Sequence, residues 1–209
     1  LVLPRLMRRI SQAAPRIQLT TVRFGRQDLK ADLFSGQLDA AADVIVPRSR
    51  QIRHQPLSSD RLAVVVRRGH PAIAGELSLE TYLAQGHILV SSRPSGPGVE
   101  DFELSRRGMQ RRVVLRCQHY FAALRVVAET DLIVTMPQRL ARIVNPQFDH
   151  QILPFPLEMP RHRYYLLWHE NMDDDPGHRW LREQIVQSFV EAGTVDGASG
   201  DLAGDRGSV

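Results

Sequence analysis

Apolar and polar positions along the first part of the chain follow two periods, and their alternation predicts helices and strands in turn. Four apolar side chains recur at helical spacing: Leu3, Leu6, Met7 and Ile10. They predict a helix over residues 1–14, which Pro15 closes. Residues 17–22 alternate in polarity and predict a strand. A helix over residues 27–35 and a short apolar strand over residues 39–46 complete a strand–helix–strand unit.

The middle and the end of the chain continue this alternation. Strands are predicted over residues 61–68, 87–90, 112–117, 131–134 and 163–169. Helices are predicted over residues 78–83 and 119–129, from Pro137 to Ile143, and from Asp175 past Phe189. One more helix is predicted to end at Gly108. From Gly193 onward the sequence has no periodicity and is rich in Gly, Asp, Ser and Ala, which is typical of a disordered tail.

This order of elements predicts an α/β protein with two lobes, the second inserted into the first. The first lobe is assigned to residues 1–62 and 163–192, the second to residues 63–162, and the disordered tail to residues 193–209. In open α/β sheets, loops and helix N-termini converge at the carboxyl ends of the strands, where small molecules bind. We therefore expect a small-molecule cleft between the lobes.

The charge of the chain points to no particular partner. The formal net charge is +4, and Lys30 is the only lysine among the basic residues. The densest basic cluster consists of five arginines: Arg106, Arg107, Arg111, Arg112 and Arg116. Apolar residues interrupt this cluster, so a solvated strand and turn is favoured over a nucleic-acid patch.

The expected location is the cytoplasm. Cys117 is the only cysteine, which excludes an internal disulfide and is typical of a reducing compartment. The apolar runs are no longer than a strand, and residues 1–4 show no signal-peptide pattern. No membrane partner is therefore expected.

Candidate ligand-binding residues of the second lobe follow its predicted strands. His119 and Phe121 open a helix after a strand, so their rings are expected at the crevice, although His119 could simply cap that helix. Ser91 and Ser92 could hold a carboxylate together with helix N–H groups, or serve turn chemistry alone. Thr135 could hydrogen-bond a ligand or cap the following helix.

The corresponding edge of the first lobe is expected at Phe24, Gly25 and Arg26. Phe24 could stack on an aromatic ligand, and Arg26 could pair with a carboxylate through two parallel hydrogen bonds. Arg26 could equally be a solvated residue in the first turn of a helix.

Catalytic and metal-binding patterns are weak. His162, His169 and His178 lack the spacing of metal ligands, and no Gly-x-Ser-x-Gly elbow occurs. Cys117 lies in a strand pattern, where an inert thiol is favoured over a nucleophile. The acidic run at residues 173–175 is interpreted as negative charge at a helix N-terminus rather than a cation site. We expect no catalysis, no metal and no cofactor.

Several short motifs resemble the effector domain of LysR-type transcriptional regulators when taken in their order. They are the stretches at residues 36–41 (Gly-Gln-Leu-Asp-Ala-Ala), 69–71 (Gly-His-Pro) and 130–137 (Thr-Asp-Leu-Ile-Val-Thr-Met-Pro). Trp168-His169 and residues 175–182 are similar to the branch that contains nodulation regulators and regulators of naphthalene and nitroaromatic breakdown. The resemblance extends over most of the chain.

The resemblance implies two Rossmann-like lobes with a cleft between them, as in type 2 periplasmic binding proteins. It implies a small organic acid as the effector, and His119 matches a contact residue of the aromatic-acid branch. It also implies a homodimer or tetramer formed through lobe helices. DNA would be bound only through an N-terminal winged helix-turn-helix, which this sequence lacks, as it lacks the family's opening strand. A solute-binding protein of a transporter is the alternative with the same fold, and an enzyme is a third.

Overall fold

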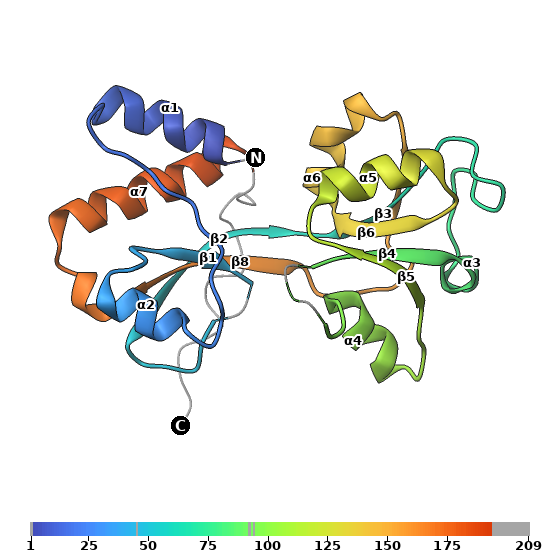
Figure 1. Ribbon diagram of the computed structural model, residues 1–209, viewed down its shortest axis with the longest axis horizontal. Helices are drawn as coiled ribbons and strands as arrows, with labels where there is room; N and C mark the ends of the chain where they lie inside the picture. The colour runs from blue at the N-terminus through green and yellow to red at the C-terminus, as the bar shows by residue number, and fades with distance from the viewer. Residues whose placement is uncertain (1, 45, 92, 94, 194–209) are drawn as a thin grey trace. The chain divides into compact units, whose positions relative to one another are not determined.

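The computed structural model describes residues 2–44, 46–91, 93 and 95–193 of the chain (Figure 1). The chain divides into two compact units. Unit 1 contains the residues up to Ser59 and from His162 on, and unit 2 contains Asp60–Arg161. Unit 2 is therefore continuous in sequence, whereas unit 1 is assembled from both ends of the chain.

Unit 1 is a small sheet covered by helices. Its strands are β1 (Ala41–Asp43), β2 (Ile52–Asp60) and β8 (His162–His169), and its helices are α1 (Leu3–Ala13), α2 (Leu29–Ser35) and α7 (Pro176–Glu191), with a short 3-10 turn at Glu170–Met172. The strand order is β1-β8-β2, so the strand that arrives last in the sequence lies in the middle. β1 runs antiparallel to β8, with Asp43 opposite Tyr165.

The second half of the central strand β8 is buried on both faces, which explains its apolar run at residues 166–168. On one face, Leu167 packs against Leu29 and Leu33 of α2 and against β1. Leu166 and Trp168 pack on the other face against apolar residues of α7. The two cores of unit 1 therefore meet at this one strand.

Helix α1 lies beside α7 (Figure 1). Leu6 and Ile10 are buried under it, as the helical spacing predicts. Arg9 donates to the Gln184 side chain at 3.1 Å and pairs with Glu191 at 2.5 Å. Polar contacts along the rim thus complete an apolar helix–helix contact.

Unit 2 is a five-stranded mixed sheet with helices on both faces (Figure 1). Its strands are β3 (Leu62–Val66), β4 (Gly86–Val90), β5 (Arg112–Cys117), β6 (Ile133–Pro137) and β7 (Gln151–Pro154), in the order β5-β4-β6-β3-β7. β4 runs parallel to β5 and β6, and β3 runs antiparallel to β6 and β7. The helices are α3 (Leu79–Ala84), α4 (Val99–Arg106), α5 (Tyr120–Glu129) and α6 (Gln138–Val144), followed by a 3-10 turn at Asn145–Gln147.

Two apolar clusters fill the two faces of this sheet. α5 and α6 cover one face, where Val65, Ile88 and Val134 are buried. α3 and α4 contribute to the other, where Val64 and Ile133 are buried. Neighbouring residues of β3 and β6 thus serve opposite cores, as the alternation of side chains along a strand requires.

Three departures from the sequence analysis stand out. The strand predicted over residues 17–22 is wrong, because residues 17–25 have no regular structure and Ile17 and Val22 are 45% and 58% exposed. β2 and β7 were not predicted. β2 is an edge strand that contains Pro56 and exposes much of its length, so it lacks a clear apolar pattern.

The predicted tail falls almost wholly on residues 194–209, outside the described part of the chain. Among the described helices, none combines the length and the apolar character that a membrane span requires.

Candidate functional site

The carboxyl ends of β5, β4 and β6, three neighbouring parallel strands of unit 2, lie at one edge of its sheet. β4 ends at Val90, β5 at Cys117 and β6 at Pro137. The backbone N–H of Ser91 donates to the Cys117 carbonyl at 2.9 Å, which joins the first two ends. We call this the unit 2 edge, and it is where an open α/β sheet offers its loops to a ligand.

His119 and Phe121 follow the end of β5 at the unit 2 edge. His119 is the N-cap residue of α5 and is exposed. Its backbone is extended (φ −130°), and within the described residues its side chain makes no capping hydrogen bond to the helix. The Phe121 ring is 59% exposed and meets Phe148 edge-on, with the ring centroids 5.5 Å apart. An imidazole and a phenyl ring are therefore accessible within one helical turn.

The serine candidates are less informative. The Ser91 hydroxyl accepts a hydrogen bond from the backbone N–H of Arg93 at 3.1 Å, which is turn chemistry. Ser92 lies outside the described residues. Ser91 therefore belongs to the unit 2 edge by position, but its oxygen already has a partner.

Thr135 lies inside unit 2 and apart from the other candidates. It is 6% exposed, and its hydroxyl shares a hydrogen bond of 2.9 Å with the Tyr82 hydroxyl. The expectation that Thr135 caps the next helix is wrong, because β6 continues to Pro137, which is the N-cap residue of α6. The sequence analysis instead missed Asp60, whose carboxylate accepts from the backbone N–H of Arg139 at 3.2 Å.

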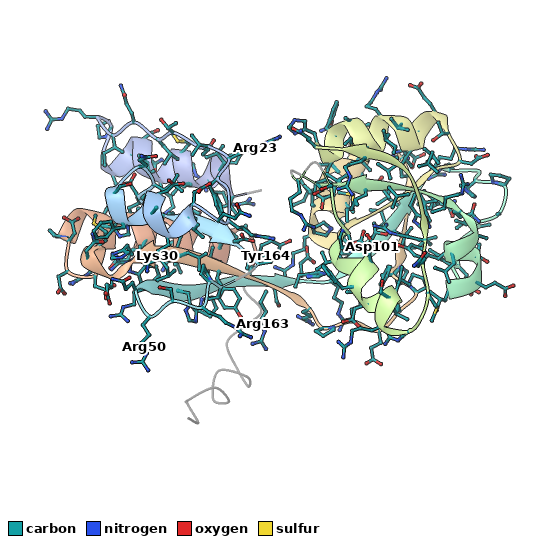
Figure 2. All side chains as sticks on the ribbon, turned by 60° about the horizontal axis from the view of Figure 1, so that its bottom comes forward. Arg23, Lys30, Arg50, Asp101, Arg163 and Tyr164 are labelled. Carbon is teal, nitrogen blue, oxygen red and sulfur yellow. The ribbon has the colours of Figure 1, made fainter. Side chains whose placement is uncertain are left out.

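A buried charge cluster lies beneath α4, where Figure 2 labels Asp101. Arg111 has no exposed side-chain surface, and its guanidinium meets Glu100 and Asp101 at 2.6 Å each. Burial raises the pKa of Glu100. Burial by itself raises the pKa of Asp101, but the hydrogen bonds from Arg111 outweigh it and hold the pKa of that carboxyl below its ordinary value. The expectation of a solvated arginine cluster is therefore wrong for Arg111.

Two aromatic residues complete this cluster. Burial raises the pKa of Tyr82 to about 12, so its hydroxyl stays protonated. Burial, together with the nearby Arg111, lowers the pKa of His87 to about 4. The neutral His87 ring donates through Nε2 to the Tyr82 carbonyl at 2.9 Å, and Nδ1 has no hydrogen-bond partner among the described residues. The cluster ties α3, α4, β4 and the segment just before β5 together.

A cavity of about 340 Å³ opens beside this cluster, between α4 and β5. Its walls include Leu89, Leu104, Met109 and Val113 as well as Asp101 and Arg111. The two charged groups in its wall, Asp101 and Arg111, already pair with each other, so the cluster is a structural anchor of unit 2.

The candidates of unit 1 lie before α2. Phe24 is half-buried against the α2 core, and Gly25 and Arg26 follow it in an exposed turn. Arg26 donates to both carboxylate oxygens of Asp43, from Nε at 2.7 Å and from Nη2 at 2.6 Å. The hydrogen bonds with Asp43 raise the pKa of Arg26 above its ordinary value. Asp43 ends β1 and was missed by the sequence analysis.

The histidines proposed to be scattered rather than metal-binding have separate structural partners. His178 Nε2 donates to the Asp39 carbonyl at 2.7 Å, and His169 Nδ1 accepts from the backbone N–H of Asn171 at 3.2 Å. No group of three metal-ligating side chains occurs in the described ranges.

The sequence profile of the LysR substrate binding domain matches residues 1–190. The chain belongs to this family. The HTH-type transcriptional activator NagR of Ralstonia sp is 33% identical over 190 residues, which cover 91% of this chain and 63% of NagR. NahR of Pseudomonas putida is 28% identical over 189 residues, which cover 90% of this chain and 63% of NahR. The chain thus spans less than two thirds of these curated relatives.

Solved structures agree with this assignment. The probable transcriptional regulator PA0477 of Pseudomonas aeruginosa is 32% identical and superposes with a TM-score of 0.79, over 88% of this chain and 61% of PA0477. The regulatory domain of MexT from the same species is 26% identical with a TM-score of 0.78, over 90% of both chains. The predicted α/β fold and the resemblance to LysR effector domains are confirmed. LysR domains are not enzymes, and the solute-binding alternative is set aside by the family match.

Proposed function

We propose that this LysR domain binds a small aromatic organic acid through the unit 2 edge and the turn of unit 1 around Arg26. The observation that carries the proposal is the pair of accessible rings at His119 and Phe121. An aromatic ring stacked on such side chains gains about 0.5–1.5 kcal/mol beyond the burial of its area. Arg26 supplies the cation that a carboxylate needs.

Binding acts as a signal only if the acid prefers one arrangement of the domain. A ligand with equal affinity for two states shifts neither, however tightly it binds. In the full-length regulator, the preferred arrangement would be transmitted to N-terminal DNA-binding helices and to a homodimer or tetramer formed through lobe helices. The regulator would act in the cytoplasm.

A thermal-shift screen with benzoates, salicylates and aliphatic acids tests this function. Because an acid that binds only the folded state stabilises it by mass action, the melting temperature should rise with aromatic acids. His119→Ala and Phe121→Ala should each reduce that rise. Phe102→Ala is the matched control, since Phe102 is similarly exposed (53%) but lies on α4.

Two results would contradict the proposal. One is the absence of a shift with every acid. The other is an equal loss of the shift in Phe102→Ala and Phe121→Ala, because the rings at the unit 2 edge would then have no special role.

A further inference from the structure

Asp43 is held rigidly at the end of β1. Its Oδ1 accepts a hydrogen bond from the backbone N–H of Val44 at 2.6 Å, and its side chain is only 9% exposed. The same carboxylate accepts both Arg26 hydrogen bonds. Asp43 therefore has a fixed orientation before any ligand arrives.

Arg26 uses only one edge of its guanidinium for Asp43. A guanidinium has five N–H donors and two edges that each match a carboxylate: one formed by Nε and Nη2, the other by Nη1 and Nη2. The bonds to Asp43 occupy the Nε–Nη2 edge. Within the described residues, Nη1 makes no hydrogen bond, and the Arg26 side chain is 45% exposed. A second carboxylate can thus reach the outer edge.

We infer that Asp43 is a positioning residue for the effector: it holds the Arg26 guanidinium so that the Nη1–Nη2 edge binds the carboxylate of the acid. The inference deepens the proposed function and rests on it. The inference assigns a role to Asp43, which would not contact the ligand itself. It also requires that the ligand has a planar carboxylate facing the Nη1–Nη2 edge of Arg26.

Positioning and simple electrostatics predict opposite effects for Asp43→Asn. If the charge of Asp43 only weakens the local positive potential, its removal should tighten the binding of an anion. If Asp43 orients Arg26, its removal should weaken binding, because the asparagine amide N–H₂ replaces one of the two acceptors. An oriented hydrogen bond to a charged group contributes enough that we expect a loss of about tenfold in affinity.

The experiment is calorimetric titration of the 209-residue chain with benzoate and salicylate, and with benzamide and salicylamide as uncharged analogues. Asp43→Asn should weaken the binding of the acids about tenfold and leave the amides unchanged. In an Arg26→Lys background, Asp43→Asn should have no further effect, because lysine keeps the charge but lacks the second edge.

Asp149→Asn is the matched control. It removes one exposed contact with Arg68 (2.6 Å) at a residue whose φ of 55° asparagine adopts readily, and it should change no affinity. The melting temperature of each unliganded variant verifies that it is folded.

The outcomes separate the inference from the proposed function. If the wild type binds neither acid, the proposed function fails and the inference falls with it. If the wild type binds an acid but Asp43→Asn tightens binding or leaves it unchanged, the function stands and the positioning role is overturned. A loss that persists unchanged in the Arg26→Lys background also overturns it.

Discussion

Arg26 and Arg111 are both paired with carboxylates, yet they differ in whether the pairing leaves N–H donors of the guanidinium accessible. Arg111 lies between Glu100 and Asp101 with no exposed surface, so its donors are used inside unit 2. Among the described residues, Arg26 pairs only with Asp43, and it keeps an exposed outer edge. Burial with a full set of partners therefore marks a structural arginine, whereas orientation with spare donors marks one suited to recognition.

Arg111→Met should give the largest effect on stability. It leaves the buried Glu100 and the partly buried Asp101 without a cation, and breaking a buried pair in this way costs about 3–5 kcal/mol of the free energy of unfolding. Urea unfolding measures the difference. A loss below about 1 kcal/mol would show that the carboxylates find other partners or take up protons.

The pH dependence of stability should reveal His87. Its pKa is lowered to about 4 in the folded chain and is about 6.5 when unfolded, so the unfolded state binds the proton first as the pH falls. Stability should therefore decrease between about pH 6.5 and pH 4, by about 3 kcal/mol in total.

His87→Gln isolates this contribution, because glutamine can still donate to the Tyr82 carbonyl but does not titrate. The difference in unfolding free energy between wild type and variant should change over this pH range. A constant difference would contradict the buried neutral state.

Tyr82→Phe should have an intermediate effect. It removes the hydroxyl that meets Thr135 at 2.9 Å and Arg111 at 3.4 Å, and it leaves the buried Thr135 oxygen without that partner. We expect a loss of about 1–2 kcal/mol in the free energy of unfolding, measured in urea. Thr135→Val in the Tyr82→Phe background should restore part of it, and additive losses would argue against the shared hydrogen bond.

Arg26→Met should change stability least, by less than about 1 kcal/mol, because its pair with Asp43 is partly exposed. The same variant should abolish acid binding in the calorimetric titration. A stability loss as large as that of Arg111→Met would remove the distinction between the two arginines.

The sequence predicts the elements of unit 2 better than their surroundings. The helix after the strand at 112–117 begins where expected, so His119 lies at its N-cap as a strand-end residue should. Thr135 was misplaced because the apolar run ends before the strand does, and hydrogen bonding to β3 extends β6 to Pro137.

Partners that lie in other elements of the fold explain the other differences. The burial of Arg111 depends on acidic residues of α4, and no periodicity around Arg111 reveals them. The predicted strand over residues 39–46 placed Asp43 inside the strand, so neither its position at the end of β1 nor its bond to Arg26 follows from the sequence alone. The alternation at residues 17–22 is real, yet a strand needs a hydrogen-bonded neighbour, and the described residues provide none there.

The order of synthesis gives the division of the chain a consequence. Unit 2 is complete once Arg161 has left the ribosome, whereas unit 1 still lacks β8 and α7. Since β8 is the middle strand of its sheet, β1 and β2 have no shared neighbour until the last stretch of the chain emerges. Nascent chains halted at a length at which Arg161 has emerged but β8 and α7 have not would therefore carry a protease-resistant unit 2 and a protease-sensitive N-terminal region.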